Sequence, residues 1–419
     1  MNMNNWMSGL PNSLSLSNMS IPGTHDSATF LAGVLSSISW AAFPLELAQE
    51  YVQCQTKDFP TQLGMGIRFL DLRVMPSGGG LMLCHGKVPL VEPLQYALNA
   101  VKDFLSQNPT ETVLVSVKND GDGDIGDVLS AIVSSGTYPF YTGIAVPTLG
   151  EVRGRMVLIN RIGAKQNLGI HVGFPNNTTK SVTCTQYDGS TLEFAIQDAY
   201  TPSTALFDSS LTNKIEAIER GYAGYSSGSY ALRFAFLSAT YFPTRTPRSF
   251  AHGINLHVWR FIYQNAKGSP WITIMDYVGE EGTGQRDAVA AVLNANDFSG
   301  GQSQKTELAA DQSLHPGESI YSQNKTYQAI MQSDGNFVVY RLCDNYVMGA
   351  TATHGTGANI ATMQTDGNFV VYAGTTAKAS TATNGAGAGC RLVMQNDGNL
   401  VIYDGSGKAR WSLYTGKFK

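Results

Sequence analysis

The sequence predicts a multidomain protein: an irregular (β/α) barrel of the TIM type followed by a smaller all-β domain. Over roughly the first 300 residues, short and nearly continuous apolar strands alternate with helical segments, which is typical of a parallel sheet covered on both faces. The composition then shifts to Gly, Ser and Gln, as in a linker, and afterwards one strand motif occurs three times. We therefore expect a barrel over residues 1–298, a linker over 299–305 and an all-β domain over 306–419.

The composition excludes several classes of protein. Hydrophobic residues make up 43% of the chain, which excludes disorder, and the net charge of −4 argues against a nucleic-acid binder. No apolar run reaches the length of about 18 residues that a membrane span needs, so we expect membrane contact to be peripheral. The cysteines form no Cys-x-x-Cys pair, which argues against a zinc site. Low charge with abundant Gly, Ser and Thr favours a secreted protein, although the first residues show no signal peptide.

The elements of the barrel are predicted from apolar segments. Leucine and valine recur at helical spacing within residues 89–107, and residues 160–230 contain long loops. This succession fits one barrel, in which chemistry collects where the strands end at the carboxyl face. The predicted strands are residues 66–74, 81–84, 112–117, 156–159, 231–237 and 271–275.

Titratable side chains follow most of these strands, although only 14% of the residues are charged. In one barrel such side chains converge on one pocket. Two histidines with cationic neighbours suit phosphoryl transfer, because one imidazole can deprotonate an attacking hydroxyl while the other protonates the leaving oxygen. An arginine would neutralise the charge that grows on the phosphate. The candidates are His25, Asp26, Asp71, Arg73, His85, Lys118, Asp120, Arg161 and Asp276.

Five motifs carry these candidates: IPGTHDS at 21–27, IRFLDLR at 67–73, HG at 85–86, VSVK at 115–118 and IMDY at 274–277. In this order and spacing they resemble the bacterial phosphatidylinositol-specific phospholipase C family. The resemblance covers roughly residues 5–298, and the pairing of the first motif with the second and third is its most specific part.

The resemblance implies a role for each matched residue. His25 would deprotonate the inositol 2-hydroxyl, with Asp276 orienting the imidazole. His85, assisted by Asp26, would protonate the diacylglycerol oxygen, and Arg73 would contact the phosphate. The product would be inositol 1,2-cyclic phosphate. Contacts with the inositol ring are implied for Lys118, Arg161, Asp198 and Tyr200, and also for Asp120, whose side chain is shorter than the Glu that the family pattern leads us to expect.

The same resemblance implies a metal-independent enzyme without a cofactor. Eukaryotic relatives bind calcium with acidic residues near the first histidine, and Arg73 stands where they carry an acidic ligand. A fixed positive charge beside the phosphate makes calcium redundant. The acidic run 120–124 looks like a calcium loop, but it lacks the distal Glu of an EF-hand, so we interpret it as a solvated turn.

Structural interpretations of the same residues remain open. His25 could cap a turn, and Asp71 with Arg73 could form an ion pair at the end of a strand. Three other histidines match no motif, and we expect them to be structural or on the surface: His171, His252 and His257.

Two segments that combine aromatic residues with proline, 38–45 and 241–250, are candidates for a rim that meets the membrane. The second adds Arg245 and Arg248. For Trp40 and Phe43 in the first segment, ordinary core packing is an equally open alternative.

The motif of the second domain reads Q-x-D-x-N-x-V-x-Y in all three copies. Alternate residues of a strand face one side, so each copy predicts one polar stripe with an apolar patch. Amides and carboxylates that project together can pair with sugar hydroxyls. The copies are Gln332, Asp334, Asn336, Val338 and Tyr340; Gln364, Asp366, Asn368, Val370 and Tyr372; and Gln395, Asp397, Asn399, Val401 and Tyr403.

This pattern resembles the monocot mannose-binding (bulb-type) lectin family over about residues 306–419. The resemblance implies a β-prism with three mannose sites. Trp411 fits the tryptophan that ends a repeat of that family and packs in the centre of the prism, whereas Gly349 and Ser380 are expected at the matching positions of the first two repeats. Packing in the centre should therefore differ.

Together the resemblances predict a metal-independent phosphatidylinositol phosphodiesterase whose lectin domain targets mannose-containing glycans. Its partners would be such glycans and membranes that contain phosphatidylinositol or glycosylphosphatidylinositol. The alternative is a sugar-binding lectin with an inactive barrel, against which the presence of His25, Arg73, His85 and Asp276 argues. A third hypothesis, a metal-dependent phosphodiesterase of another barrel family, is disfavoured because the sequence shows no evident acidic metal cluster.

Overall fold

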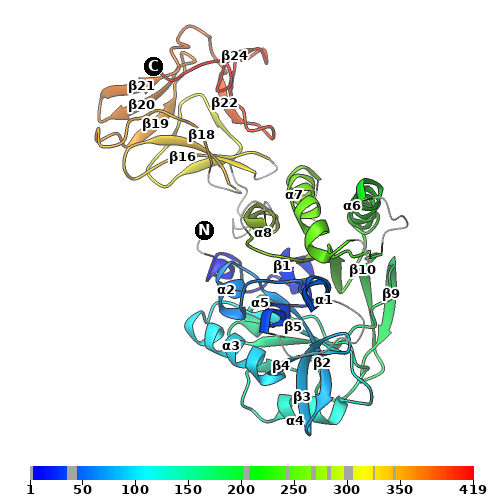
Figure 1. The fold of residues 1–419 in the computed structure, drawn as a ribbon. Helices are drawn as coiled ribbons and strands as arrows, with labels where there is room; N and C mark the ends of the chain where they lie inside the picture. The colour runs from blue at the N-terminus through cyan, green and yellow to red at the C-terminus, as the bar shows by residue number, and fades with distance from the viewer. Residues whose placement is uncertain are drawn as a thin grey trace. The chain divides into compact units, whose positions relative to one another are not determined.

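The computed structural model describes residues 3–34, 45–201, 207–241, 245–265, 270–280, 285–296, 305–323, 326–342 and 346–419. The chain separates into two compact units, residues 1–300 and 301–419 (Figure 1). Within the described residues, none of the helices is both long and apolar enough to cross a membrane.

One sheet of 12 strands organises the first unit. Its path runs β6-β7-β5-β2-β1-β12-β11-β10-β9, and every neighbouring pair from β6 to β10 is parallel. The strands are β1 (Ile21–Thr24), β2 (Phe69–Ser77), β3 (Gly80–His85), β4 (Val88–Pro93), β5 (Val113–Asn119), β6 (Phe140–Tyr141), β7 (Met156–Asn160), β8 (Ile170–His171), β9 (Thr179–Thr185), β10 (Thr191–Gln197), β11 (Leu232–Phe236) and β12 (Ile272–Met275).

Helices cover the sheet of the first unit, and α6, α7 and α8 lie next to one another along one side of it (Figure 1). The α-helices are α1 (Leu45–Val52), α2 (Phe59–Gly64), α3 (Leu94–Gln107), α4 (Gly126–Ser134), α5 (Leu149–Val152), α6 (Phe207–Gly224), α7 (Pro247–Asn265) and α8 (Gln285–Asn294). Three short 3₁₀ helices are η1 (Trp6–Gly9), η2 (Leu16–Asn18) and η3 (Thr29–Val34).

The central strands are nearly continuous runs of buried residues, because helices or other strands cover both faces. Close approach of β1 to β2 requires a glycine in the first motif. A Cβ on Gly23 would lie 2.9 Å from the side chain of Phe69, which is closer than real contacts allow. This close approach brings the carboxyl end of β1 near the start of β2.

Two sequence predictions for the first unit are wrong in detail. Residues 88–93 form β4, an antiparallel partner of β3, rather than the start of a helix, which begins at Leu94. The stretch expected to be loops contains the antiparallel pair β9 and β10 and the helix α6. Polar residues alternate along β9, so the apolar runs used to find the buried strands do not occur in it.

The described residues of the second unit form three four-stranded antiparallel sheets. Each sheet takes three strands from one sequence repeat, and its fourth strand comes from the segment before the repeats. Its strands are β13 (Glu307–Ala309), β14 (Gln312–Leu314), β15 (Ser319–Tyr321), β16 (Tyr327–Met331), β17 (Phe337–Arg341), β18 (Tyr346–Ala350), β19 (Ile360–Met363), β20 (Phe369–Ala373), β21 (Thr376–Ser380), β22 (Arg391–Met394), β23 (Leu400–Tyr403) and β24 (Ala409–Ser412).

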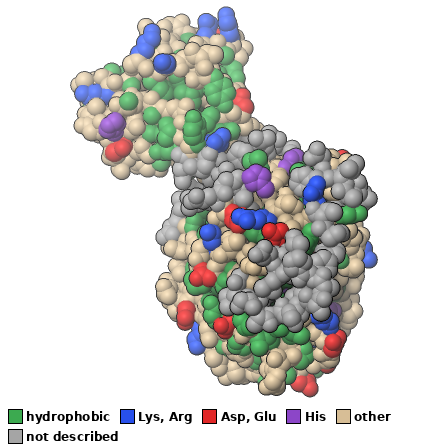
Figure 2. Space-filling model, in the orientation of Figure 1, with side chains coloured by type: hydrophobic (Ala, Val, Ile, Leu, Met, Phe, Trp, Pro, Cys, Tyr) green, Lys and Arg blue, Asp and Glu red, His purple; other side chains and the backbone are tan. Residues whose placement is uncertain are grey.

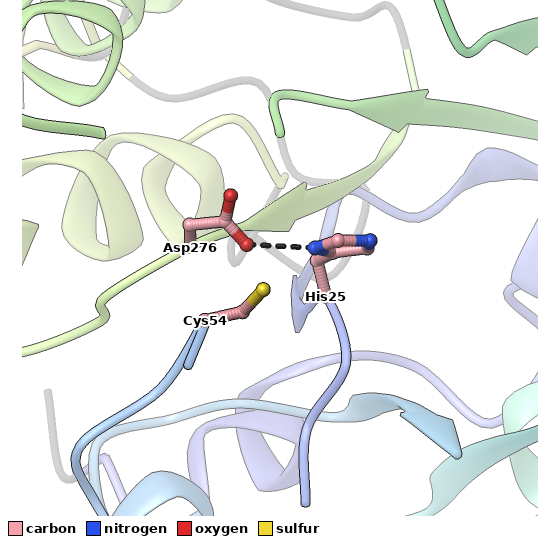
Figure 3. A group of neighbouring side chains, drawn as sticks. All are labelled: His25, Cys54 and Asp276. Carbon is pink, nitrogen blue, oxygen red and sulfur yellow. Dashed lines mark hydrogen bonds and ion pairs between the residues drawn. The ribbon is translucent and has the colours of Figure 1, made fainter. Parts of the chain in front are cut away.

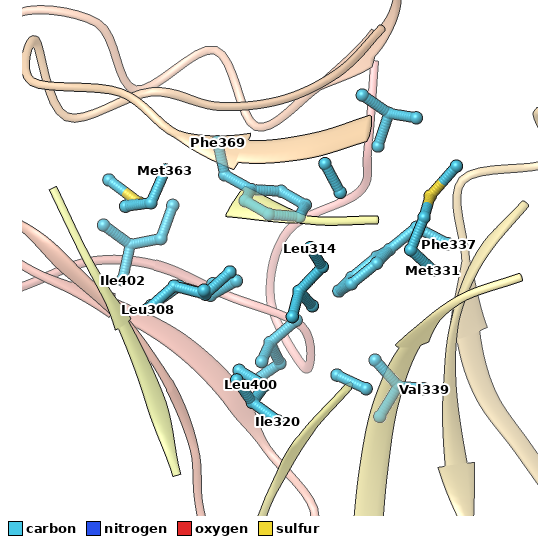
Figure 4. Close-up of a cluster of buried hydrophobic side chains, with 14 of the residues drawn as sticks. Leu308, Leu314, Ile320, Met331, Phe337, Val339, Met363, Phe369, Leu400 and Ile402 are labelled. Atoms are coloured by element: carbon cyan, nitrogen blue, oxygen red, sulfur yellow. The ribbon is translucent and has the colours of Figure 1, made fainter. Parts of the chain in front are cut away.

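One apolar core lies between the three sheets of the second unit (Figure 4). Phe337 and Phe369 meet there with ring centroids 4.8 Å apart, and Trp411 belongs to the same cluster. Each repeat enters this core after a D-G-N turn whose glycine has a φ of 90 or 91°, a conformation that side chains with a Cβ rarely adopt.

The prediction that Ser380 matches Trp411 is wrong by one residue. Trp411 pairs with Ile402, and the residues at this register in the other sheets are Gly349 and Ala379. A bulge stands at the same place in all three sheets, so the difference comes from the turn before the last strand. Tyr340 pairs with Val347, Tyr372 with Ala377 and Tyr403 with Ala409, so this turn has a different length in each sheet, which spacing alone did not reveal. Phe418 packs beside Trp411 with ring centroids 4.9 Å apart and also reaches Phe337 and Phe369, so the C-terminal segment fills space next to the two small residues.

Candidate active site

A cavity of about 420 Å³ lies where the parallel strands of the first unit end. Most of the predicted site residues line it, and Asp120 lies beside it in contact with Arg73 and Lys118. The predicted residues that line the cavity are His25, Asp26, Arg73, His85, Lys118, Arg161, Asp198, Tyr200 and Asp276. The convergence expected of strand ends in a barrel is therefore present.

His25 and Asp276 form a hydrogen-bonded pair (Figure 3), in which His25 Nδ1 lies 2.8 Å from Asp276 Oδ1. They directly follow the paired strands β1 and β12, so the sheet register makes them neighbours. The side-chain amide of Gln55 donates to the carbonyls of both His25 and Met275, at 3.0 and 2.8 Å, and so holds the two strand ends together. Because Nδ1 is bonded to the carboxylate, Nε2 is the nitrogen left for chemistry in the cavity.

The charge of His25 depends on its two carboxylate neighbours. Burial alone would lower the pKa of His25, but Asp26 and Asp276 outweigh burial and raise it from 6.5 to about 9. At neutral pH the free protein therefore holds a positively charged imidazolium at this position.

Asp26 lies between the two histidines. Its Oδ2 atom is 3.2 Å from His25 Nε2 and 3.3 Å from His85 Nε2. His85 Nδ1 lies 2.7 Å from the carbonyl oxygen of Val52. A carbonyl can only accept a hydrogen bond, so His85 Nδ1 carries a proton, and Nε2 is directed at Asp26 and the cavity.

Arg73 on β2 connects this group to the next strand. Its Nε atom lies 2.7 Å from Asp26, and Nη2 lies 3.1 Å from both Asp71 and His25 Nε2. The buried Asp71 carboxylate also pairs with Arg161 at 3.0 Å. Burial would raise the pKa of Asp71, but the two arginines hold it well below its usual range. The ion pair considered as a structural alternative therefore exists, and its arginine also lines the cavity.

A second group of polar side chains lines the cavity or lies beside it. Lys118 Nζ is 2.6 Å from Asp120, and the Arg161 guanidinium stacks on the Phe174 ring at 4.1 Å. Burial raises the pKa of Asp198, although neighbouring cations oppose this effect. The Tyr200 hydroxyl donates to Asn176 at 2.8 Å. These hydroxyl, carboxylate and cationic groups suit a polyhydroxylated ring.

Several side chains could approach a metal ion. Among the described residues, three groups bring potential ligand atoms within 4.8 Å of one another: His25, Cys54 and Asp276 (Figure 3); Asp26, Cys54 and His85; and His25, Asp26 and Asp71. In the third group Arg73 already pairs with both carboxylates, so a cation there would compete with the guanidinium. Burial raises the pKa of Cys54 well above its usual value, which disfavours the thiolate that a metal would need in the other two groups.

The acidic run 120–124 pairs with lysines instead of collecting around one point. Asp122 and Asp124 lie 2.7 and 2.6 Å from Lys87 and Lys165. The Asp122 and Asp124 side chains are 97% and 68% exposed, as expected of a solvated turn, whereas that of Asp120 is only 8% exposed.

The predicted rim segments are only partly described. Residues 38–44 and 242–244 lie outside the described residues, as do Trp40 and Phe43. Phe250 is fully buried, so its predicted place on a membrane-facing rim is wrong. Arg248 pairs with Glu280 at 3.0 Å. On the face shown in Figure 2, acidic and basic side chains of the described residues are interspersed.

The histidines without motifs lie apart from the residues that line the cavity. His171 Nδ1 contacts the carbonyl of Asn160 at 3.3 Å, and His257 Nε2 lies 2.7 Å from Glu219. Sequence reasoning missed Gln55 and Cys54, because neither belongs to a strand-end motif. A buried amide between two strand ends has no sequence signal of its own.

The three motif copies of the second unit share one arrangement. In each, the glutamine amide donates to the tyrosine hydroxyl, at distances of 3.1, 2.8 and 2.6 Å from the first copy to the third. The asparagine carbonyl accepts from neighbouring groups: Thr351 and Thr353 in the first copy, Thr381 and Thr383 in the second, Ser412 and the amide of Tyr414 in the third. Within the described residues these contacts engage the asparagine carbonyl and not its NH₂ group.

Comparison with known proteins identifies the first unit. Residues 38–161 match the family model described as phosphatidylinositol-specific phospholipase C (PI-PLC), X domain. Over these residues the chain is similar to a PI-PLC X domain. The 1-phosphatidylinositol phosphodiesterase of Staphylococcus aureus (strain Newman) is 29% identical over 311 residues, covering 70% of this chain and 94% of that protein. The homology to bacterial PI-PLC thus extends well beyond the X domain.

Solved structures of bacterial PI-PLC share the fold of the first unit. A double mutant of the S. aureus enzyme matches with a TM-score of 0.61 and 26% identity, covering 71% of this chain and 98% of that chain. The Listeria monocytogenes PI-PLC matches with a TM-score of 0.53 and 26% identity, covering 71% and 100%. A monocot mannose-binding lectin from Gastrodia elata is 37% identical and covers 27% of this chain and 99% of that chain, with a TM-score of 0.24.

Replacing Asp276 by Asn should lower the pKa of His25 from about 9 toward 6.5, because the carboxylate that bonds Nδ1 is lost. The interactions that raise this pKa favour the protonated folded state. Their contribution to the free energy of unfolding is complete below pH 6.5 and is lost as the pH rises through about 9. The free energy of unfolding of the wild type should therefore fall across that interval, and that of Asp276→Asn should fall less. Histidine NMR titration and urea unfolding on both sides of the interval measure the two effects.

The matched control for this titration is Asp122→Asn, which removes an exposed carboxylate that pairs with Lys87 away from the cavity. It should leave the pKa of His25 unchanged. An Asp276→Asn variant whose His25 still titrates near 9 would contradict the assignment of the dyad.

Proposed function

We propose that the first unit is a phosphatidylinositol phosphodiesterase that cleaves the bond between diacylglycerol and phosphoinositol. The supporting observation is that two histidine Nε2 atoms lie 3.2 and 3.3 Å from one oxygen of Asp26, with Arg73 bonded to the same carboxylate. A base, an acid and a cation thus face one cavity, as a phosphoryl transfer needs. The homology to bacterial 1-phosphatidylinositol phosphodiesterases supports the same activity.

His25 acts as the general base in this proposal. Asp276 holds Nδ1, so Nε2 takes the proton from the inositol 2-hydroxyl as its oxygen forms a bond to phosphorus. The carboxylate also stabilises the imidazolium that results. Since His25 is an imidazolium in the free protein at neutral pH, it must release its proton before or as substrate binds.

His85 acts as the general acid. The bond between phosphorus and the diacylglycerol oxygen breaks, and that oxygen takes the proton from His85 Nε2. Asp26 lies 3.3 Å from His85 Nε2, while the carbonyl of Val52 fixes the orientation of the ring. The products are diacylglycerol and inositol 1,2-cyclic phosphate.

Arg73 supplies the charge that a metal ion would otherwise supply. It pairs with Asp26 and Asp71 and lines the cavity, so its remaining donors can meet phosphate oxygens. We therefore propose that the reaction is metal-independent. The proposed contacts of the inositol ring are Lys118, Arg161, Asp198 and Tyr200. Asp120 would contribute to ring binding by pairing with Lys118.

The expected result with wild-type protein is a ³¹P NMR signal of cyclic inositol phosphate from phosphatidylinositol in detergent micelles with excess EDTA. His85→Ala should lower kcat by about 10²–10⁴-fold, the usual worth of one acid or base. His257→Ala, which removes a histidine paired with Glu219 outside the cavity, is the matched control and should keep full activity.

Two outcomes would contradict this account. If product forms only after calcium is added, the role proposed for Arg73 is wrong. If no product forms under either condition, the activity itself is wrong, and sugar binding by the second unit becomes the leading account of the chain.

We also propose that the second unit is a β-prism lectin domain that binds mannose-containing glycans. The supporting observation is the threefold recurrence of one Gln–Tyr hydrogen bond beside a tethered Asn. Sugar binding would raise the concentration of the enzyme at a glycosylated membrane. Glycosylphosphatidylinositol anchors carry both mannose and the scissile phosphate, so they are the proposed partners, together with phosphatidylinositol membranes. Action outside the cell stays a prediction from composition.

The triple variant Tyr340→Phe, Tyr372→Phe and Tyr403→Phe should weaken binding to immobilised mannose by about tenfold or more, because each site loses a hydroxyl that a sugar would meet. Affinity retention and competitive elution with methyl mannoside measure the effect. Tyr321→Phe is the matched control, since Tyr321 forms a similar bond with Gln328 outside the motif. Equal retention of the triple variant and the control would contradict the proposal.

A further inference from the structure

Lys214 is a buried lysine in the first unit whose amino group bonds only to carbonyl groups within the described residues. It lies on α6, its side chain is shielded from solvent, and Nζ donates to the carbonyls of Ala199 and Phe236 at 2.8 and 2.7 Å. A buried ammonium is costly unless hydrogen bonds compensate it. The two short hydrogen bonds compensate the burial of this ammonium, and they join it to two defined backbone positions.

The two acceptors belong to the ends of adjacent strands. Helix α6 is the crossover between the parallel strands β10 and β11, and Phe236 is the last residue of β11. Ala199 lies two residues beyond the end of β10. One amino group therefore holds together two backbone segments at the carboxyl edge of the sheet, where the cavity lies.

Each anchored segment carries residues of the proposed site. Ala199 stands between Asp198 and Tyr200, both of which line the cavity on the side proposed for the inositol ring. The ring of Phe236 meets the ring of His25 edge-on at 6.0 Å, and it lies 5.8 Å from the Arg161 guanidinium. The lysine thus connects the proposed ring-binding segment with a contact of the proposed base.

The charge of the amino group fits this position. Asp198 and Asp276 act on it from the ends of β10 and β12. Burial lowers the pKa of Lys214 to about 8, against the effect of the two carboxylates, so the group is charged at neutral pH.

We propose that Lys214 is a positioning residue that sets the distance between the inositol-binding segment and the base, and thereby the affinity for an inositol ring. This inference rests on the proposed function. Lys214 does not line the cavity, so it acts through Asp198 and Tyr200 on one side and Phe236 on the other.

The test compares two variants in the full-length chain. Lys214→Met replaces the methylene chain by one of similar bulk and removes all donors, and its KM for phosphatidylinositol in micelles should rise by about tenfold or more. Lys214→Gln keeps an NH₂ group on a side chain that is one bond shorter, so it can reach only one carbonyl, and a smaller rise of KM by about threefold is expected. Binding of myo-inositol, measured by calorimetry, should weaken in the same order.

Tyr222→Phe is the matched control. Tyr222 is a buried residue of the same helix, and its hydroxyl lies 2.6 Å from Thr273 Oγ1 on β12, away from the residues that line the cavity. The loss of this bond should lower Tm without changing KM. A purely structural role for Lys214 would give the same pattern as this control.

The outcomes separate this inference from the proposed function. If the wild type cleaves phosphatidylinositol and either Lys214 variant folds with unchanged KM and unchanged affinity for myo-inositol, the inference is overturned. If Lys214→Met does not fold, Lys214→Gln decides by the same criterion. If the wild type does not cleave phosphatidylinositol, the proposed function fails first, and calorimetry with myo-inositol still tests Lys214.

Discussion

The ion pair between Asp26 and Arg73, at 2.7 Å, is the contact on which the arrangement of the site depends. Asp26 reaches both histidines, and Arg73 reaches His25 and Asp71. Asp26 has a φ of 41°, an uncommon value for a residue with a Cβ. The flanking backbone compensates this strain, since His25 and Ser27 donate to the carbonyls of Met275 and Asp71. A strained backbone conformation at Asp26 therefore places one carboxylate between two imidazoles.

Much of this site could be predicted from the sequence, because strand ends in a parallel barrel meet at one edge. The motifs around His25, Arg73, His85 and Asp276 predict that these residues meet at one pocket, and all four line the cavity. The hydrogen bonds that hold the surrounding strand ends in place could not be predicted. Gln55 and Lys214 act through backbone carbonyls of distant segments, and such acceptors have no side-chain pattern in the sequence.

In the second unit, the sequence predicted the strands but not the register in which they pair. Its three repeats predicted three similar strand groups, and the described structure has three four-stranded sheets. The turn after Tyr372 is one residue shorter than the turn after Tyr403, since Tyr372 pairs with Ala377 and Tyr403 with Ala409, so the equivalent of Trp411 is Ala379 and not Ser380. A turn of different length changes which residue stands at a given register without changing the strand pattern, so spacing alone is misleading there. The aromatic ring of Phe418 reaches the core from the C-terminal segment, outside the repeated motif.

The most direct test of the shared carboxylate is the kcat of Asp26→Asn on phosphatidylinositol micelles in EDTA. The variant keeps the shape of the side chain and removes its charge, so we predict a loss of kcat of about 10² or more with little change in KM. Asp122→Asn, which changes an exposed carboxylate paired with Lys87, should behave as the wild type. A kcat for Asp26→Asn within about twofold of the wild type would contradict the claim that one carboxylate serves both histidines.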